Sequence, residues 1–418
     1  MKLSFISICK NYYGVIFFIF LCLSLFGGFF LNEDASGGGN SSDFYLTLPY
    51  VEELKKDIFS VSSKWTVHFP LHYIILSKLS FFAINEQTLR FYFTCISILI
   101  PILFYNCAKI KFRKKNSNLL LALASIIFVI PAFRYSAIWA NAQNTAFIFF
   151  LVSIYFFLKW EKKKINFIDI NIAFHLVTFF LSVYSRQYFL FFIFYFLFIY
   201  LLRLNWKNNL AIYIAIFTFS LPGFILVLHN NTFISGTGLS FKFYNSFLVN
   251  FSIISFYLIP IFFINFFFDK SKFVDIKKNY IYLPIFFLIV FFLAFFFDYN
   301  YHLGGGFFLK SSRIILNNNF FFYFTSLLGL FLTYIIVKEN IINFITIILI
   351  VFCFSGNVIY QKYFEPLFFI FFFLFLKTKY YEIFFLKLKA ILVLFTYYSI
   401  YLSLSILNNL YKITKTIL

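Results

Sequence analysis

The fold is decided by long apolar runs, the first of which is YGVIFFIFLCLSLFGGFFL at residues 13–31. A helix needs about 20 mainly apolar residues to cross the hydrocarbon core of a bilayer, and this run supplies them. Lys2 and Lys10 precede it, as basic residues do in a signal peptide, but the residues after it offer no small-residue cleavage site. We therefore expect an uncleaved first transmembrane helix.

The composition of the whole chain points the same way. Of the 418 residues, 62% are hydrophobic and 26% aromatic, whereas only 12% are charged. Soluble domains carry roughly a quarter charged residues, so a soluble globular enzyme, a disordered chain and a secreted disulfide scaffold are excluded. The five cysteines lack the paired spacing of a metal site or a disulfide framework, which favours free buried thiols.

Similar apolar runs predict an all-α, polytopic membrane protein with about 13 transmembrane helices in a single domain, residues 1–418. The predicted spans are 13–31, 88–108, 118–132, 144–158, 168–184, 188–202, 209–228, 246–268, 281–297, 320–337, 341–355, 365–376 and 390–408. Residues 69–84 are also apolar, but they contain Pro70 and Lys78. We expect them to form an in-plane or re-entrant helix and not a full crossing.

The distribution of charge predicts the orientation. Lysine and arginine gather in every second loop, and the loops between are poorer in them, as the positive-inside rule requires. The basic loops and the N-terminus are therefore predicted to be cytoplasmic, in the inner (plasma) membrane. The net charge of +20 is then a topology signal and gives no reason to expect a nucleic-acid partner.

The longest outer segment, residues 32–87, carries the first candidate chemistry. Asp34 and Asp43 stand on either side of a glycine run, which releases the backbone from helical structure. We expect a short amphipathic helix to begin near Asp43 with Ser41 or Ser42 as its cap. Both acids would then face one cavity; the alternative is that they are solvated loop acids.

Three further outer segments each place a cation among aromatic and amide side chains. Arg134 lies in the predicted turn 133–144, Arg186 lies between two apolar spans, and Lys362 lies near Glu365. Ionisable residues at membrane depth usually face a bundle interior or a water-filled cavity. The alternatives are an Arg186 that extends to the membrane interface and a Lys362–Glu365 pair on one helical turn.

Histidine positions give little support for a metal site. His68 and His72 are four residues apart, but Pro70 between them disfavours a helical pair of zinc ligands. No cofactor follows from the sequence, and a divalent metal is not indicated.

The order of these features resembles that of the integral-membrane GT-C glycosyltransferases, which include the protein O-mannosyltransferases and the lipid A aminoarabinose transferases. The matching pieces are the first span, the acidic outer loop, the helix start His68-Phe69-Pro70-Leu71-His72, the segment Phe133-Arg134-Tyr135-Ser136 and the segment 360–366. The likeness covers residues 1–160 and a short stretch near 360. The chain lacks an adjacent Asp-Asp or Asp-Glu pair, which leaves open which carboxylate is catalytic.

The resemblance implies transfer of a sugar from a polyprenyl-phosphate donor to a glycan or glycolipid on the extracytoplasmic side. A carboxylate would act as general base, with Asp43 preferred and Asp34 second. Cationic side chains would hold the leaving phosphate. The implied substrate-binding residues are His72, Arg134, Arg186, Lys362, Tyr363 and Glu365.

Two other functions stay open at this point. One is an O-antigen-type polysaccharide polymerase, and the other is a flippase or transporter of lipid-linked glycans. A transporter would be expected to carry charges near the membrane midplane, whereas here they lie at the outer ends of the spans. The partners expected for the enzyme are the lipid-linked donor, the acceptor and membrane lipids.

Overall fold

The computed structural model describes residues 5–34, 39–57, 68–113, 115–163, 165–229, 242–269, 277–356 and 358–417. Regular structure in these ranges is helical throughout, without a strand, which confirms the predicted all-α fold. The chain divides into two compact units: unit 1 comprises residues 1–237 and 398–418, and unit 2 comprises residues 238–397.

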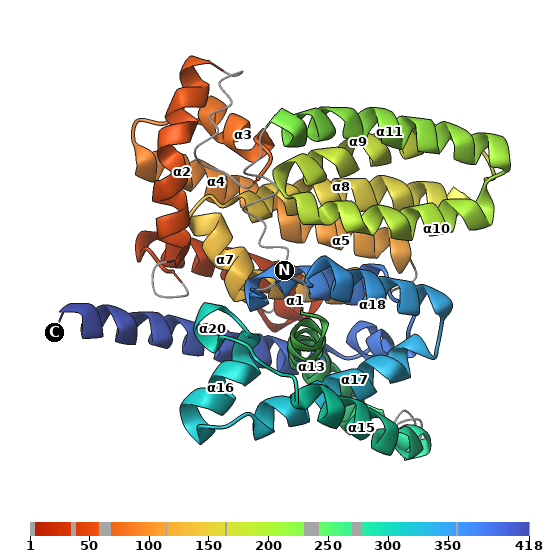
Figure 1. Ribbon diagram of the computed structural model, residues 1–418. Helices are drawn as coiled ribbons and strands as arrows, with labels where there is room; N and C mark the ends of the chain where they lie inside the picture. The colour runs from red at the N-terminus through yellow and green to blue at the C-terminus, as the bar shows by residue number, and fades with distance from the viewer. Residues whose placement is uncertain are drawn as a thin grey trace. The chain divides into compact units, whose positions relative to one another are not determined.

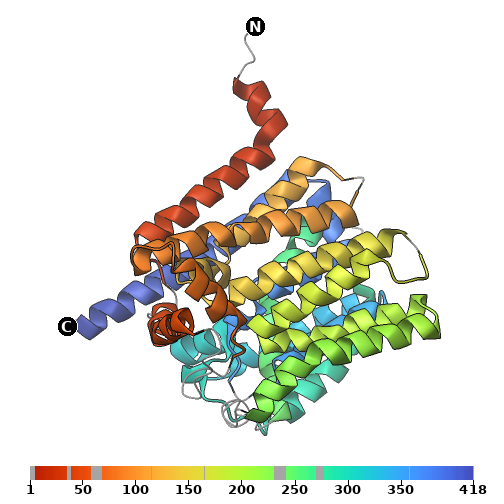
Figure 2. The ribbon, with the colours of Figure 1, turned by 90° about the horizontal axis from the view of Figure 1, so that it is seen from above.

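Unit 1 contains the helices from the N-terminus to α11. They are α1 (Phe5–Phe30), α2 (Gly39–Lys56), α3 (Leu71–Leu79), α4 (Glu86–Ser97), α5 (Leu99–Lys111), α6 (Ser117–Ser125), η1 (Ile126–Val129), α7 (Pro131–Ile138), α8 (Ala142–Lys163), α9 (Ile170–Ser185), η2 (Gln187–Phe192), α10 (Ile193–Arg203) and α11 (Trp206–His229). Helices α5, α8, α9, α10 and α11 lie side by side (Figures 1 and 2).

A bend of 67° between η1 and α7 corrects one part of the sequence prediction. Pro131 begins α7, and a residue before proline is disfavoured in the α conformation, so Ile130 is extended. Residues 131–138, which were predicted as the end of the span 118–132 and the start of the outer turn 133–144, instead form a short helix whose side chains are all buried.

Unit 2 contains the remaining helices and the beginning of the last one. They are α13 (Phe243–Phe268), η3 (Tyr280–Tyr282), α15 (Leu283–Ala294), η4 (Tyr301–Leu303), α16 (Gly306–Leu316), α17 (Phe320–Val337), α18 (Ile341–Cys353), η5 (Gln361–Phe364), α19 (Leu367–Leu374), η6 (Lys379–Phe385) and α20 (Leu388–Ile417). Helix α13 forms the core of this unit. Gly329 lets α17 approach it closely, because an added Cβ would lie 1.9 Å from the Phe251 carbonyl oxygen.

Eight helices within the described ranges are long and apolar enough to cross a membrane. They are Tyr12–Phe30, Glu86–Lys111, Ala142–Lys163, Trp206–Leu228, Phe243–Phe268, Lys277–Ala294, Phe320–Val337 and Leu388–Asn409. The predicted spans 168–184, 188–202 and 341–355 coincide with shorter apolar helices, so the larger number of crossings stays a prediction. These helices support a multi-pass membrane protein.

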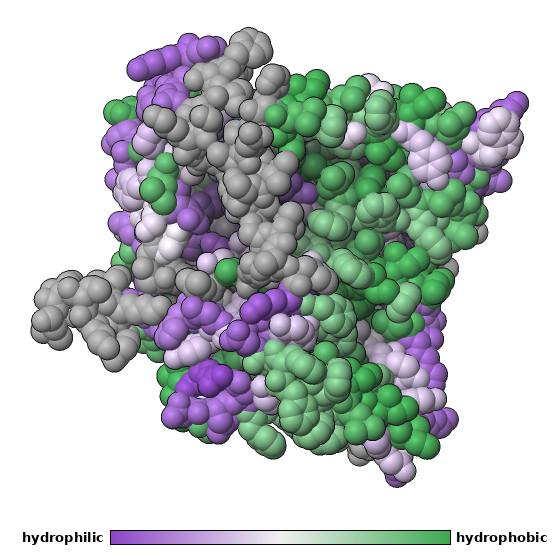
Figure 3. Space-filling view, viewed as in Figure 1, coloured by the Kyte–Doolittle hydropathy of each residue, from purple (hydrophilic) through white to green (hydrophobic). Residues whose placement is uncertain are grey.

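The surface of unit 1 is strongly divided. The face formed by α9, α10 and α11 is hydrophobic, whereas hydrophilic residues gather over α2 (Figure 3). Phe194 on α10 and Phe217 and Phe224 on α11 are more than half exposed. An apolar surface of this extent is expected to face lipid.

Candidate functional site

The N-terminus of α2 is held by Asp34. This side chain is only 4% exposed, and one of its oxygens accepts hydrogen bonds from Asn40 N (3.3 Å) and Asn40 Nδ2 (3.0 Å). The other oxygen accepts from Ser41 N at 2.8 Å. The first N–H groups of a helix lack partners within it, and the helix dipole favours an anion there.

This contact corrects the expected cap. Helix α2 begins at Gly39, so Ser41 and Ser42 lie inside its first turn and neither precedes it. The capping carboxylate comes from Asp34, several residues earlier in the chain. Residues 35–38, which join Asp34 to α2 and include part of the glycine run, lie outside the described residues.

Asp43, the preferred candidate base, has a different environment on the same helix. Its side chain is exposed, whereas the adjacent Phe44 is buried. Its carboxylate lies close enough to Tyr73 of α3 to influence the pKa of that side chain. Burial raises the pKa of Tyr73, the positive charge of Arg186 opposes this rise, and the negative charge of Asp43 adds to it. Asp43 and Arg186 therefore both lie within electrostatic reach of Tyr73.

His72 is an internal anchor of this region. It is 1% exposed, and its ring nitrogens contact Thr145 Oγ1 at 2.8 Å and the Ala140 carbonyl at 2.9 Å. Burial, together with the positive charge of Arg186, lowers the pKa of His72 to about 3. The ring is therefore neutral, and Nε2 donates to the Ala140 carbonyl while Nδ1 accepts from Thr145.

Arg186 follows α9 directly and contacts His68, which lies shortly before α3. Its Nη1 donates to His68 Nε2, and the opposite nitrogen of that ring lies 3.2 Å from Gln187 Oε1. The Nε of Arg186 is buried and has no hydrogen-bond partner among the residues that the structure describes.

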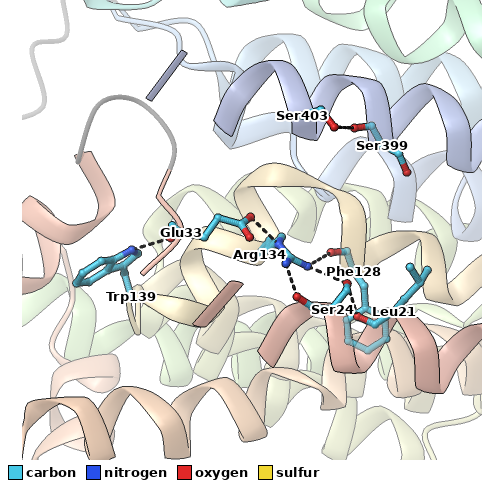
Figure 4. A network of polar contacts seen from close by, with 8 residues as sticks. All are labelled: Leu21, Ser24, Glu33, Phe128, Arg134, Trp139, Ser399 and Ser403. Carbon is cyan, nitrogen blue, oxygen red and sulfur yellow. Dashed lines mark hydrogen bonds and ion pairs between the residues drawn. The ribbon is translucent and has the colours of Figure 1, made fainter. Parts of the chain in front are cut away.

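Arg134 is engaged by protein groups on all three guanidinium nitrogens (Figure 4). Nε donates to Glu33 Oε1 at 2.6 Å, Nη1 donates to Ser24 Oγ at 3.1 Å, and Nη2 donates to the Ser24 carbonyl. The arginine and glutamate side chains are 6% and 8% exposed. This ion pair fastens α7 to the end of α1, and it favours a positioning role for Arg134 over direct contact with a substrate.

Arg90 and Trp139 belong to the same region, and the sequence analysis assigned them no role in the site. The Arg90 guanidinium lies 3.5 Å from the Trp139 ring centre, while its nitrogens donate to the Ile138 carbonyl and to Asn32 Oδ1, both at 3.0 Å. Trp139 Nε1 in turn donates to the Glu33 carbonyl at 3.0 Å. Together these residues fix the segment that leads to Asp34. In the sequence, the available signal was an arginine at the start of an apolar run.

Unit 1 contains an apolar groove of about 400 Å³. Its walls come from Phe69, from Phe180 and Tyr184 of α9, and from Gly223 and Phe224 of α11. The rings of Phe69 and Tyr184 are in edge contact at 5.5 Å. His68 and Arg186, which are hydrogen-bonded to each other, lie close in the sequence to these two rings, but neither of them lines the groove.

The remaining candidates lie in unit 2, on or beside η5. Glu365 is 2% exposed and accepts a hydrogen bond from the Tyr257 hydroxyl at 2.9 Å. The Lys362 ammonium lies 5.4 Å from the Tyr360 ring centre, and the Tyr363 ring lies 5.5 Å from the same ring. The three predicted residues Lys362, Tyr363 and Glu365 thus share one aromatic-rich segment of this unit.

The described residues contain no group of three or more His, Cys, Asp or Glu side chains placed to hold a metal ion. Comparisons of the chain with protein-family models, with curated proteins and with solved structures found no match. Any functional conclusion therefore depends on the site itself.

Proposed function

We propose that the protein is a membrane glycosyltransferase of the GT-C type, which moves a sugar from a polyprenyl-phosphate donor to an extracytoplasmic glycan or glycolipid. The observation that supports the proposal is that Asp43 and Arg186 both lie near enough to Tyr73 to influence its pKa, in opposite directions. Asp43 is the proposed base and Arg186 the proposed phosphate-binding residue. Both lie near Tyr73 of the short helix α3.

The apolar groove of unit 1 supports a lipid-linked donor in particular. Its walls are apolar and it lies along α11, a candidate membrane span. In this proposal a hydrocarbon chain occupies the groove, and its phosphate is held by Arg186, which follows the groove residue Tyr184 in the sequence. Arginine is well suited to phosphate because its planar group can donate two parallel hydrogen bonds.

The proposed reaction assigns one role to each charge. The Asp43 carboxylate accepts the proton of an acceptor hydroxyl, whose oxygen attacks the anomeric carbon of the donor sugar. The bond between that carbon and the phosphate oxygen breaks, and polyprenyl phosphate leaves with the electron pair. Arg186 stabilises the negative charge that develops on this leaving group. Asp34, Arg134 and His72 hold the surrounding segments in place.

The test uses the full chain in nanodiscs, decaprenyl phosphate linked to radiolabelled hexoses, and extracted cell-envelope glycolipid as acceptor. Asp43→Asn should abolish transfer of the label, and Arg186→Ala should raise the donor concentration needed for half-maximal rate. Glu52→Gln on α2 and Lys78→Gln on α3 are matched controls, since both side chains are exposed.

Transfer by Asp43→Asn at the wild-type rate would remove Asp43 as the base. A wild-type protein that transfers no label but equilibrates the donor between the two leaflets of a vesicle would overturn the enzyme proposal in favour of a flippase.

A further inference from the structure

One end of unit 1 brings together three segments that are distant in the sequence. Helices α5, α8 and α10 end there, and α11 begins there (Figures 1 and 2). Lys162 of α8 donates to the Lys111 carbonyl of α5 at 3.3 Å. Arg203 of α10 donates to the Glu161 carbonyl of α8 at 2.9 Å. Asn208 of α11 donates to a carbonyl of the loop between α8 and α9 at 3.2 Å. These hydrogen bonds join the three segments into one surface.

Positive charge dominates this surface, which we call the basic end. Its cations within the described part of residues 105–117, 155–172 and 200–210 are Lys109, Lys111, Arg113, Lys115, Lys159, Lys162, Lys163, Arg203 and Lys207. The same ranges contain two acidic residues, and both are already paired. Asp169 contacts Lys163 at 2.6 Å, and Glu161 contacts Arg203 at 3.1 Å. Most of the positive charge is therefore not balanced by acids of the basic end itself.

Three exposed lysines of the basic end, one on each of α5, α8 and α11, lie over an aromatic ring of their own helix. The distances from ammonium to ring centre are 5.9 Å for Lys109 and Tyr105, 4.3 Å for Lys159 and Tyr155, and 5.9 Å for Lys207 and Trp206. Tryptophan and tyrosine are enriched where a membrane meets water, and Trp206 is 71% exposed. This combination of side chains is typical of the lipid head-group layer.

The neighbouring surface decides which anion the basic end can meet. The hydrophobic face of α9, α10 and α11 runs up to this end, where hydrophilic residues replace it (Figure 3). Phe167 and Ile170 are exposed at the same end, by 57% and 65%. Because the hydrophobic face is expected to contact hydrocarbon, the cations that follow it lie at the level of the lipid phosphates. Basic surfaces at this level bind anionic head groups.

We propose that the basic end binds the head groups of anionic phospholipids, with Lys109, Lys159 and Lys207 as the contacting cations. This inference goes beyond the proposed sugar transfer and does not depend on it. Each ammonium donates hydrogen bonds to phosphate oxygens, and Trp206 lies beside the bound lipid. Phosphatidylcholine carries the same phosphate but is neutral overall, so it should bind more weakly. Each lysine that contacts an anionic head group should add about a fivefold preference.

Trp206 provides the measurement. The other two tryptophans of the described residues, Trp139 and Trp160, are buried. Trp65 lies outside the described residues and is replaced by phenylalanine in every protein. The full chain is reconstituted in bilayers of dibrominated phosphatidylglycerol with ordinary phosphatidylcholine, and in the reverse mixture. Bromine quenches tryptophan fluorescence only at close range, so the two quenching curves give the relative affinity of the two lipids at Trp206.

Two matched variants each replace three exposed lysines by glutamine and so remove the same charge. The test variant carries Lys109→Gln, Lys159→Gln and Lys207→Gln, and the control carries Lys277→Gln, Lys377→Gln and Lys389→Gln in unit 2. Wild type and control should prefer phosphatidylglycerol by at least about fivefold, whereas the test variant should show no preference. Sodium chloride at about 1 M should reduce the wild-type preference, because it shortens the screening length to about 3 Å.

Several results would overturn the inference. One is equal quenching by the two lipids in wild type, and another is a test variant that keeps the wild-type preference. An equal loss in the control would assign the effect to net charge and not to the basic end. Suppression of the preference by soluble polyglutamate would assign the surface to an acidic protein. If the test variant does not fold, Lys207→Gln alone should lower the preference by about fivefold, and an unchanged value would again contradict the inference.

Discussion

Replacement of Gly28 by alanine tests whether the Arg134–Glu33 pair organises unit 1. A Cβ at residue 28 would lie 2.2 Å from Glu33 Oε2 and 2.6 Å from Arg134 Nη2. Both distances are too short for a real Cβ, so the ends of the Glu33 and Arg134 side chains must move, and we expect the buried pair to separate. Breaking a buried ion pair costs about 3–5 kcal/mol, and the gain in helix propensity on changing glycine to alanine offsets about 1 kcal/mol. We expect Gly28→Ala to lower the free energy of unfolding by about 2–4 kcal/mol.

The adjacent glycine supplies the control. Gly27→Ala adds the same methyl group to the same helix without any atom within 4 Å, so it should be neutral or slightly stabilising. Unfolding in mixed micelles with increasing dodecyl sulfate gives both free energies. A double-mutant cycle with Glu33→Ala tests the pair directly. Gly28→Ala should lower the free energy of unfolding by less when residue 33 is alanine, because the Glu33 carboxylate is then absent. Equal stability of the two alanine variants would refute the reasoning.

Three further predictions concern His72, Gly329 and Asp34. Because the pKa of His72 is about 3 in the folded protein and about 6.5 when unfolded, the unfolded state binds more protons below pH 6.5. Stability should therefore fall by about 2 kcal/mol between pH 7 and pH 5, and His72→Asn should flatten this dependence in the same unfolding assay. Gly329→Ala should destabilise unit 2 by about 1–3 kcal/mol. Gly356→Ala should not, because no atom lies within 4 Å of the added Cβ. Equal proteolysis rates of the two variants would contradict this prediction. Asp34→Asn should speed hydrogen exchange at the start of α2, and unchanged exchange there would count against its capping role.

The sequence predicts the helices well because the requirement behind them is local. A membrane crossing needs an uninterrupted apolar run. The predicted spans 13–31, 209–228 and 246–268 each overlap a candidate membrane-spanning helix of the structure. The bend at Pro131 could also have been placed, since the restriction on the residue before a proline acts between neighbours. The 8 residues of α7 include polar side chains that are typical of a turn in the sequence. Their burial follows from contacts with distant residues, which the sequence does not show.

Those distant partners explain why the site was predicted only in part. Asp34 and Arg134 were singled out from the sequence as charges in an apolar chain, but the contacts that they make come from residues distant in the sequence. The Arg134–Glu33 bond joins residues 101 positions apart, and no periodic pattern encodes such a pair. Gly28 gave no signal either, because a glycine in an apolar helix has many ordinary explanations.

The contacts of the two acids also bear on which one is the base. A general base must bring a free lone pair to the acceptor hydroxyl. Asp34 already accepts three hydrogen bonds at the start of α2, and a substrate would have to displace one of them and loosen the helix. Asp43 is exposed, and it lies on the helix that Asp34 fixes. In the proposed reaction the two acids would therefore divide the work: Asp34 holds the helix, and Asp43 would meet the substrate, which does not require the adjacent acidic residues that the family pattern would supply.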